Sequence, residues 1–245
     1  MEFLDSDKLA GIDAAAYRSR RPFPWINPAG LIRDDAFATL IANLPDISQF
    51  KKAFGNARAH GQKSHDRYSL KYRDGLDLPA PWQAFIDELR GPEYRTFLQR
   101  TLGQRFLETD FLWFYTPAGC SVSPHCDHKD KLGAHIFYLN TDADWSANWG
   151  GETLILDSGG RISRRSAPEF EDFDDVIATV GMNNHSLLFS RSDKSWHGVR
   201  AIDCPDGNLR RVFLVAIKRV GAREKLSRYL KEWIPDRAPL PDRAA

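Results

Sequence analysis

Residues 186–217 read SLLFSRSDKSWHGVRAIDCPDGNLRRVFLVAI and carry most of the information about the fold. The stretch contains three short apolar segments, at 186–190, 197–199 and 211–217, and the turn-forming sequence CPDGN separates the last two. Short aliphatic and aromatic runs between Pro, Gly, Asp and Asn are typical of strands joined by turns. We therefore expect the segments that begin at His197 and Arg211 to form one hairpin, which would bring both residues near the same cavity.

The same pattern continues towards the N-terminus. The segments LETDFLWFYT (107–116), GAHIFYLN (133–140) and TLIL (153–156) also read as strands. The intervening Pro-Ala-Gly and Trp-Gly-Gly-Glu sequences read as turns. Many short apolar strands separated by such turns favour an all-β sandwich or barrel.

One triplet in this region has the chemistry of a metal site. His125-Cys126-Asp127 follows Pro124, a residue typical of a strand start or edge. In a strand, residues i and i+2 share a face, so His125 and Asp127 would project together and Cys126 would point away. With His197 as third ligand, two imidazoles and one carboxylate would leave three metal positions open, as in non-heme Fe(II) oxygenases. By itself a His-x-Asp pair is more often a surface or structural pair.

Six ordered segments strengthen this interpretation. Together they resemble the catalytic core of the prolyl-4-hydroxylase-like 2-oxoglutarate/Fe(II) dioxygenases, over a little under half of the chain. The matching segments are FYTPAG (114–119), HCD (125–127), FYLN (137–140), WGGETLIL (149–156), LLFSRSDKSWHGV (187–199) and RVFLVAI (211–217). The fold that the resemblance implies is a mostly β protein with supporting helices, whose core is a double-stranded β-helix (a cupin-like jelly-roll) with the iron site between its sheets.

The resemblance also implies roles for individual residues. His125, Asp127 and His197 match the Fe(II) ligands. Arg211 matches the basic residue that binds the distal carboxylate of 2-oxoglutarate, and Arg210 is its competitor because adjacent strand residues face opposite ways. Two tyrosines match as well: Tyr138 with a donor to the same carboxylate, and Tyr115 with a residue lining the iron pocket. For both tyrosines the alternative is core packing with a satisfied hydroxyl.

The implied reaction is hydroxylation of an unactivated C–H bond, coupled to conversion of 2-oxoglutarate and O2 to succinate and CO2. Ascorbate is a further candidate, as reductant. Halogenating relatives replace the carboxylate ligand with a small residue, so Asp127 favours hydroxylation. The substrate is expected to be either a peptidyl residue, typically proline, or a small metabolite such as an amino acid, a natural-product or a sugar intermediate. The alternative from another class is a metal-binding or sensing β-sandwich without turnover.

Composition limits the partners. The net charge is +1 and hydrophobic residues make up 42%, which is ordinary for a globular protein and gives no support for nucleic-acid binding. No apolar run approaches the roughly 18 residues of a membrane span. Asp5, Asp7 and Asp13 interrupt the apolar stretch that a signal peptide would need. Although Cys120 and Cys126 lie near His128, the three cysteines lack a zinc-like spacing, so we expect free thiols and a cytoplasmic protein. The oligomeric state stays open.

The rest of the chain is organised around this core. We expect one domain over residues 1–245, with helical support at about 1–106, the jelly-roll core at about 107–220, and a C-terminal helix and tail at 221–245. Apolar spacing predicts helices near 34–44, 81–90, 93–102 and 222–233, and the proline-rich tail 235–245 is expected to be disordered.

Two loops are candidates for substrate contacts. The long excursion 157–184, which begins with a basic and continues with an acidic cluster, is expected to be a lid over the active site. The polar segment 55–68 is a second candidate, and the neighbouring stretch 63–73 could line a groove for a peptide. His60 and His65 of the segment 55–68 are expected to be surface residues.

Overall fold

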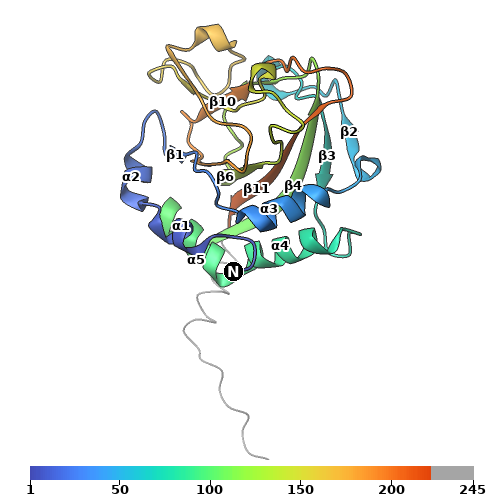
Figure 1. Ribbon diagram of the computed structural model, residues 1–245. Coiled ribbons are helices and arrows are strands. Elements are labelled where there is room, and N and C mark those ends of the chain that lie inside the picture. Colours follow the sequence, from blue (N-terminus) through green and yellow to red (C-terminus); the bar gives the residue numbers. More distant parts are fainter. Residues whose placement is uncertain (222–245) are drawn as a thin grey trace, which may run out of the picture.

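The computed structural model describes residues 1–221 (Figure 1). The helix and tail expected beyond Gly221 lie outside the described residues. Within them, the strands form two antiparallel sheets, one with the order β1-β9-β6-β11-β4-β3-β2 and one with the order β5-β10-β7-β8. This is the mostly β, double-stranded β-helix architecture that the sequence predicts.

The larger sheet consists of β1 (Trp25–Ile26), β2 (Lys51–Ala53), β3 (Arg67–Lys71), β4 (Leu107–Pro117), β6 (Lys131–Tyr138), β9 (Ser186–Ser190) and β11 (Leu209–Arg219). The smaller sheet consists of β5 (Val122–His125), β7 (Leu154–Asp157), β8 (Asp175–Ala178) and β10 (Trp196–Val199). The six apolar segments predicted as strands are all strands, and their ends agree with the prediction to within two residues.

The helices are α1 (Ser6–Gly11), α2 (Ala14–Ser19), α3 (Asp34–Ala42), α4 (Ala80–Arg90) and α5 (Pro92–Leu102), with short 3-10 turns at Ile47–Gln49, Ala59–Gly61, Ala147–Trp149 and Phe170–Asp172. The three helices predicted in this half of the chain are confirmed. Gly103, at φ 65°, ends α5 in the left-handed conformation that glycine adopts easily. Among the described residues, no helix has the length and apolar character needed to cross a bilayer.

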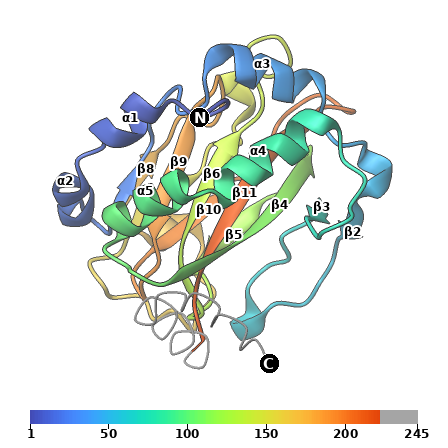
Figure 2. The ribbon, with the colours of Figure 1, turned by 90° about the horizontal axis from the view of Figure 1, so that it is seen from below.

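The helices cover the outer face of the larger sheet, and α4 and α5 run across its strands (Figure 2). Trp82 of α4 is fully buried, with its ring 5.2 Å from Trp113 of β4 and 5.1 Å from Phe213 of β11. Along β11, Phe213, Val215 and Ile217 belong to this outer core. Because side chains alternate along a strand, the even-numbered residues of β11 point the other way, between the sheets.

The predicted hairpin of His197 and Arg211 is wrong. β10 pairs with β5 and β7 in the smaller sheet, whereas β11 pairs with β4 and β6 in the larger one. The connection through residues 200–208 therefore crosses from one sheet to the other. The physical reason is that β4 is a longer partner for β11 than β10 would be. β11 pairs with β4 from Leu209 to Arg219, and the four-residue β10 could not replace those hydrogen bonds.

The excursion 157–184 is partly structured. It adds β8 to the edge of the smaller sheet, next to β7. Phe170 and Phe173 pack with Trp196 in a small core of their own. Its charged residues also have partners: Arg161 pairs with Asp174, and Glu169 pairs with Lys63 at 2.6 Å, which ties the excursion to the polar segment 55–68.

Gly133 of β6 packs directly against the backbone of β9. A Cβ atom at Gly133 would overlap the carbonyl oxygen of Phe189 and lie 3.3 Å from the Cα of Ser190. We predict that Gly133→Ala lowers the free energy of unfolding by about 1–3 kcal/mol, measured by urea denaturation, because backbone atoms must shift. The control is Gly11→Ala at the end of α1, where no atom lies within 4 Å and stability should be equal or slightly higher. Equal effects at the two positions would contradict the described pairing.

Candidate metal centre

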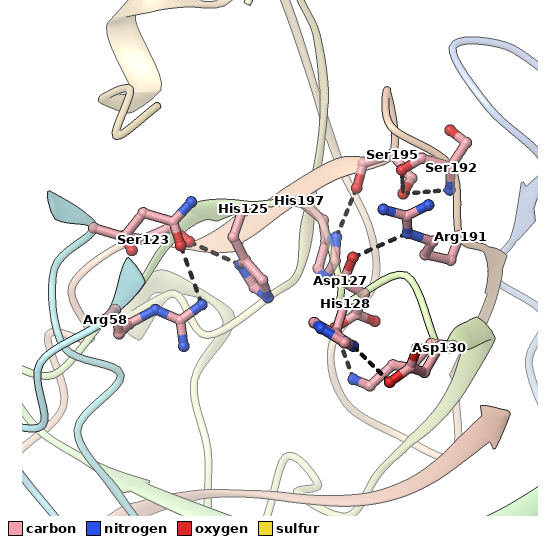
Figure 3. Close-up of polar contacts among 12 residues, drawn as sticks. Arg58, Ser123, His125, Asp127, His128, Asp130, Arg191, Ser192, Ser195 and His197 are labelled. Atoms are coloured by element: carbon pink, nitrogen blue, oxygen red, sulfur yellow. Dashed lines mark hydrogen bonds and ion pairs between the residues drawn. The ribbon is translucent and has the colours of Figure 1, made fainter. Parts of the chain in front are cut away.

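The smaller sheet, with the segment that follows β5, brings His125, Asp127 and His197 together (Figure 3). Each offers one ligand atom, and these atoms all lie within 4.8 Å of one another. The antiparallel register of β5 and β10 sets His125 directly opposite His197, with ring centroids 4.3 Å apart. β5 ends at His125, so Asp127 projects from the turn that follows and not from the strand itself. The predicted convergence of the three residues is therefore confirmed, although not its strand geometry.

The backbone fixes the tautomer of both histidines. His125 Nδ1 lies 2.9 Å from the carbonyl oxygen of Ser123, and His197 Nδ1 lies 3.0 Å from that of Ser195. A carbonyl oxygen can only accept, so Nδ1 carries the proton and Nε2 keeps its lone pair for a metal. Burial lowers the pKa of both imidazoles, and the mutual proximity of the two rings lowers that of His125 further, so both are neutral ligands at pH 7.

Asp127 supplies the negative charge. Burial alone would raise its pKa, but the charge and hydrogen bond of the Lys131 ammonium, together with the charge of Arg191, hold the pKa below its usual range. Lys131 Nζ donates to Asp127 Oδ1 at 2.7 Å, and Arg191 Nε donates to the Asp127 carbonyl oxygen at 2.9 Å. Two neutral imidazoles and one carboxylate, grouped on the wall of a cavity, are a donor set that suits Fe(II) and leaves further positions open.

His65 lies beside this group. Its Nε2 is 3.1 Å from Ser123 Oγ, and its ring centroid is 4.6 Å from that of His125. Burial lowers the pKa of His65 to about 3, so it stays neutral. The prediction of a surface position is confirmed for His60 and wrong for His65, which is 8% exposed. The sequence RYSLK did not predict β3. Because β3 pairs with β4, the segment that contains His65 lies against the larger sheet.

A cavity of about 510 Å³ opens in front of the three ligands. Its apolar wall comes from the inner face of the larger sheet, including Phe114, Ile136, Val212 and Leu214. Its charged lining is mostly basic. The cationic side chains are Arg58, Arg67, Lys71, Lys131, Arg210 and Lys218, and the carboxylates are Asp110 and Asp127.

Of the two adjacent arginines on β11, the structure brings Arg210 to the cavity. Arg210 is 5% exposed; its Nε donates to the carbonyl oxygen of Gly151 and its Nη2 to Thr153 Oγ1 at 3.4 Å. Arg211 faces the opposite side of the sheet, where its Nη1 donates to Asp144 Oδ2 at 2.7 Å. The expectation that Arg211 faces the metal centre is therefore not met, because alternation along the strand gives that direction to its neighbour.

The two candidate tyrosines also divide between the two faces. Tyr138 is fully buried on the cavity side, and its hydroxyl donates to Thr153 Oγ1 at 2.8 Å. Tyr115 pairs with Arg211 in register and points to the outer face, where its ring stacks on Phe50 at 4.3 Å. Tyr115 therefore does not line the cavity, and Phe114 takes that place.

Searches of protein-family models and of curated proteins find no match to this sequence. Solved structures do match. A prolyl-4-hydroxylase from Pseudomonas putida has a TM-score of 0.59 at 15% identity, over 84% of this chain and 98% of that one. A prolyl hydroxylase from Trichoplax adhaerens, solved with a hypoxia-inducible-factor peptide, has a TM-score of 0.60 at 12% identity over 92% and 94%.

The non-heme α-ketoglutarate-dependent carbocyclase SnoK of nogalamycin biosynthesis is similar to the same extent, with a TM-score of 0.58 at 12% identity over 90% of this chain and 92% of that one. Matches to prolyl-4-hydroxylases and other 2-oxoglutarate/Fe(II) dioxygenases thus extend over most of the chain. At these identities they establish the fold. A fold shared by hydroxylases and a carbocyclase does not by itself select the reaction.

The site predicts metal-dependent stabilisation. Manganese(II), which is stable in air, should raise the melting temperature, because binding to the folded state alone contributes about 2.7 kcal/mol at a hundredfold excess over Kd. In His125→Ala and His197→Ala most of this shift should disappear. The matched control is His60→Ala, an exposed histidine outside the cavity, which should keep the full shift. The same shift in all three variants, measured by thermal denaturation, would rule out this metal site.

Proposed function

We propose that this chain is an Fe(II)- and 2-oxoglutarate-dependent oxygenase that hydroxylates an unactivated C–H bond. The supporting observation is the set of three ligand atoms within 4.8 Å, on a cavity that also receives the buried Arg210. When bound, iron, 2-oxoglutarate and O2 supply the oxidation: 2-oxoglutarate is converted to succinate and CO2, and the oxygen atoms of O2 enter succinate and the substrate alcohol.

The protein would hold iron through His125, Asp127 and His197. The carbonyl oxygens of Ser123 and Ser195 orient the two rings, so their Nε2 atoms need no rearrangement before the metal binds. Lys131 holds one oxygen of Asp127 and leaves the other for the metal. These contacts would preorganise the site and limit the conformational cost of binding.

Arg210 is the proposed partner of the distal carboxylate of 2-oxoglutarate, in place of Arg211. Its guanidinium is buried, and among the described residues no carboxylate lies within ion-pair distance of it. The charge of Glu152 acts on it only from beyond that distance. A buried cation without a close countercharge is costly, so a bound dicarboxylate would offset that cost. Arginine also matches the planar geometry of a carboxylate with two parallel hydrogen bonds.

Tyr138 and Thr153 would support this carboxylate site. The hydroxyl of Tyr138 donates to Thr153 Oγ1, which accepts from Arg210 as well. The Arg210 guanidinium carbon lies 5.6 Å from the centre of the Tyr138 ring. We propose that Tyr138 fixes Thr153 and Arg210 in place. Tyr115 has no part in the proposal because it faces the helices.

The identity of the ligand that binds Arg210 can be tested directly. We predict that Arg210→Gln raises the dissociation constant of 2-oxoglutarate at least tenfold, since a charge-assisted hydrogen bond contributes about 1.5–3 kcal/mol. Arg211→Gln removes only a partly exposed ion pair with Asp144 and should change that constant less than about threefold. Calorimetric titration of the manganese-loaded protein measures both. A larger effect at Arg211 would overturn the assignment.

The reaction itself is tested by product analysis. The iron-loaded protein should form succinate from 2-oxoglutarate, and His197→Ala should not. With a true substrate under ¹⁸O2, the product of a hydroxylase carries an added labelled hydroxyl, whereas ring closure or epimerisation adds no oxygen. A protein that binds iron and 2-oxoglutarate but never forms succinate would instead support the metal-sensing alternative.

A further inference from the structure

The cavity carries more positive charge than bound iron and 2-oxoglutarate together would neutralise. Six cationic side chains and two carboxylates line it, which leaves an excess of four positive charges. A divalent iron and a doubly charged cosubstrate would cancel each other and leave that excess unchanged. Lys71 and Lys218 both pair with Asp110, and Lys131 pairs with Asp127. The cations without a carboxylate partner among residues 1–221 are therefore the arginines Arg58, Arg67 and Arg210.

Arg67 belongs to the cavity face of β3. Ser69 pairs in register with Phe114, which lines the cavity, and Arg67 lies two residues away on the same face. Its guanidinium carbon lies 3.7 Å from the centre of the Phe114 ring. Burial, together with the positive charges of Arg58 and Arg210, lowers the pKa of Arg67 to about 10, against the opposing effect of Asp127. The guanidinium thus rests on an aromatic surface among like charges.

Arg58, in the segment that precedes β3, extends towards His125 (Figure 3). Its Nη2 donates to Gln62 Oε1 at 3.2 Å, whereas its Nε is buried without a hydrogen-bond partner in the described part of the chain. Gln62 in turn donates to the carbonyl oxygen of Ser166, so the excursion after β7 braces this arginine. An unpartnered buried donor close to the metal ligands is costly unless a ligand accepts from it.

Arg58 and Arg67 also mark a place separate from that of Arg210. They line a second hollow of about 260 Å³ that adjoins the main cavity, shares Leu112 and Phe114 with it, and reaches Ala53 and Asn56 beside β2. Arg210 does not line this hollow. The space beyond the metal centre is therefore basic on one side and apolar on the other.

We infer that the substrate is a small acid whose carboxylate or phosphate is bound by Arg58 and Arg67, with an apolar body lying on Leu112 and Phe114. This inference rests on the proposed function and adds the substrate class. Such an anion would accept from the unpartnered Nε of Arg58 and offset the repulsion among the arginines. Its carbon body would extend from the hollow towards His125, where the reacting carbon must lie.

The test uses the protein loaded with manganese(II) and saturated with 2-oxoglutarate. The probes are 3-phenylpropanoate, phenyl phosphate and the neutral 3-phenylpropanamide. Proton relaxation of each probe, enhanced by the bound manganese, reports both its affinity and its proximity to the metal. We expect at least one anionic probe to bind about tenfold or more tightly than the amide, as one charge-assisted contact provides. The stronger anion would then identify the headgroup.

Substitutions of the two arginines test whether they bind the anionic probe. Arg58→Gln and Arg67→Gln should each weaken the anionic probe about tenfold, and Arg67→Lys, which keeps the charge without the planar fork, should weaken it less. The matched control is Arg73→Gln, an exposed arginine just past β3 and outside both cavities, which should not affect binding. Thermal denaturation verifies that each variant is folded.

Three results would overturn the inference. One is equal binding of the amide and both anions. Another is displacement of the anionic probe by 2-oxoglutarate, which would place the probe at the cosubstrate site. The third is a larger effect of Arg67→Gln on 2-oxoglutarate than on the probe. Repeating the titration without 2-oxoglutarate separates the two proposals, because a protein that binds the anion through Arg67 but never binds 2-oxoglutarate keeps the anion site and loses the oxygenase function.

Discussion

The antiparallel register of β5 and β10 is the constraint on which the site depends. It sets His125 opposite His197 at the edge of a cavity between two sheets, and the backbone carbonyl two residues before each histidine fixes its ring. Burial keeps both imidazoles neutral, while Lys131 keeps Asp127 ionised. A shift of one residue in this register would turn a histidine away and leave the carboxylate paired only with lysine.

The sequence predicted six of the eleven strands in residues 1–221 and the three candidate metal ligands, because their signals are local. A His-x-Asp triplet, a later histidine and a series of short apolar segments are visible without knowing what pairs with what. Which side of a strand faces the cavity is a tertiary property. The segment RRVFLVAI contains both Arg210 and Arg211, and only the pairing of β11 with β4 and β6 shows that the even-numbered residues point inward. For the same reason Phe114 lines the cavity, whereas the adjacent Tyr115 points to the outer face.

The side of the site around β3 had only a coarse signal. The segments 55–68 and 63–73 were expected to contact substrate, but β3 is short and its sequence RYSLK is mostly polar, so neither the burial of His65 nor the direction of Arg67 could be predicted. The hairpin expected between His197 and Arg211 failed for a related reason, since the choice between sheets depends on distant partners. The first omission concerns the side of the cavity where the substrate is proposed to bind, whereas the three candidate metal ligands were found from the sequence.

The chemistry of the cavity follows from its charges. One buried arginine near the ligands suits a dicarboxylate cosubstrate, and two more on the β3 side leave room and charge for a second anion. The energetic cost of holding three guanidinium groups close together is consistent with a site built for ligands, because strained electrostatics of this kind is often found at functional positions.

The most direct test is an anaerobic titration of the metal-free protein with Fe(II) and then 2-oxoglutarate, followed by absorbance spectroscopy. Chelation of the keto acid by iron held in an open three-ligand site should produce a weak charge-transfer band near about 500–530 nm. We expect the band in the wild-type protein and its absence in His125→Ala. A folded, iron-loaded wild-type protein that shows no band when 2-oxoglutarate is added would contradict the account.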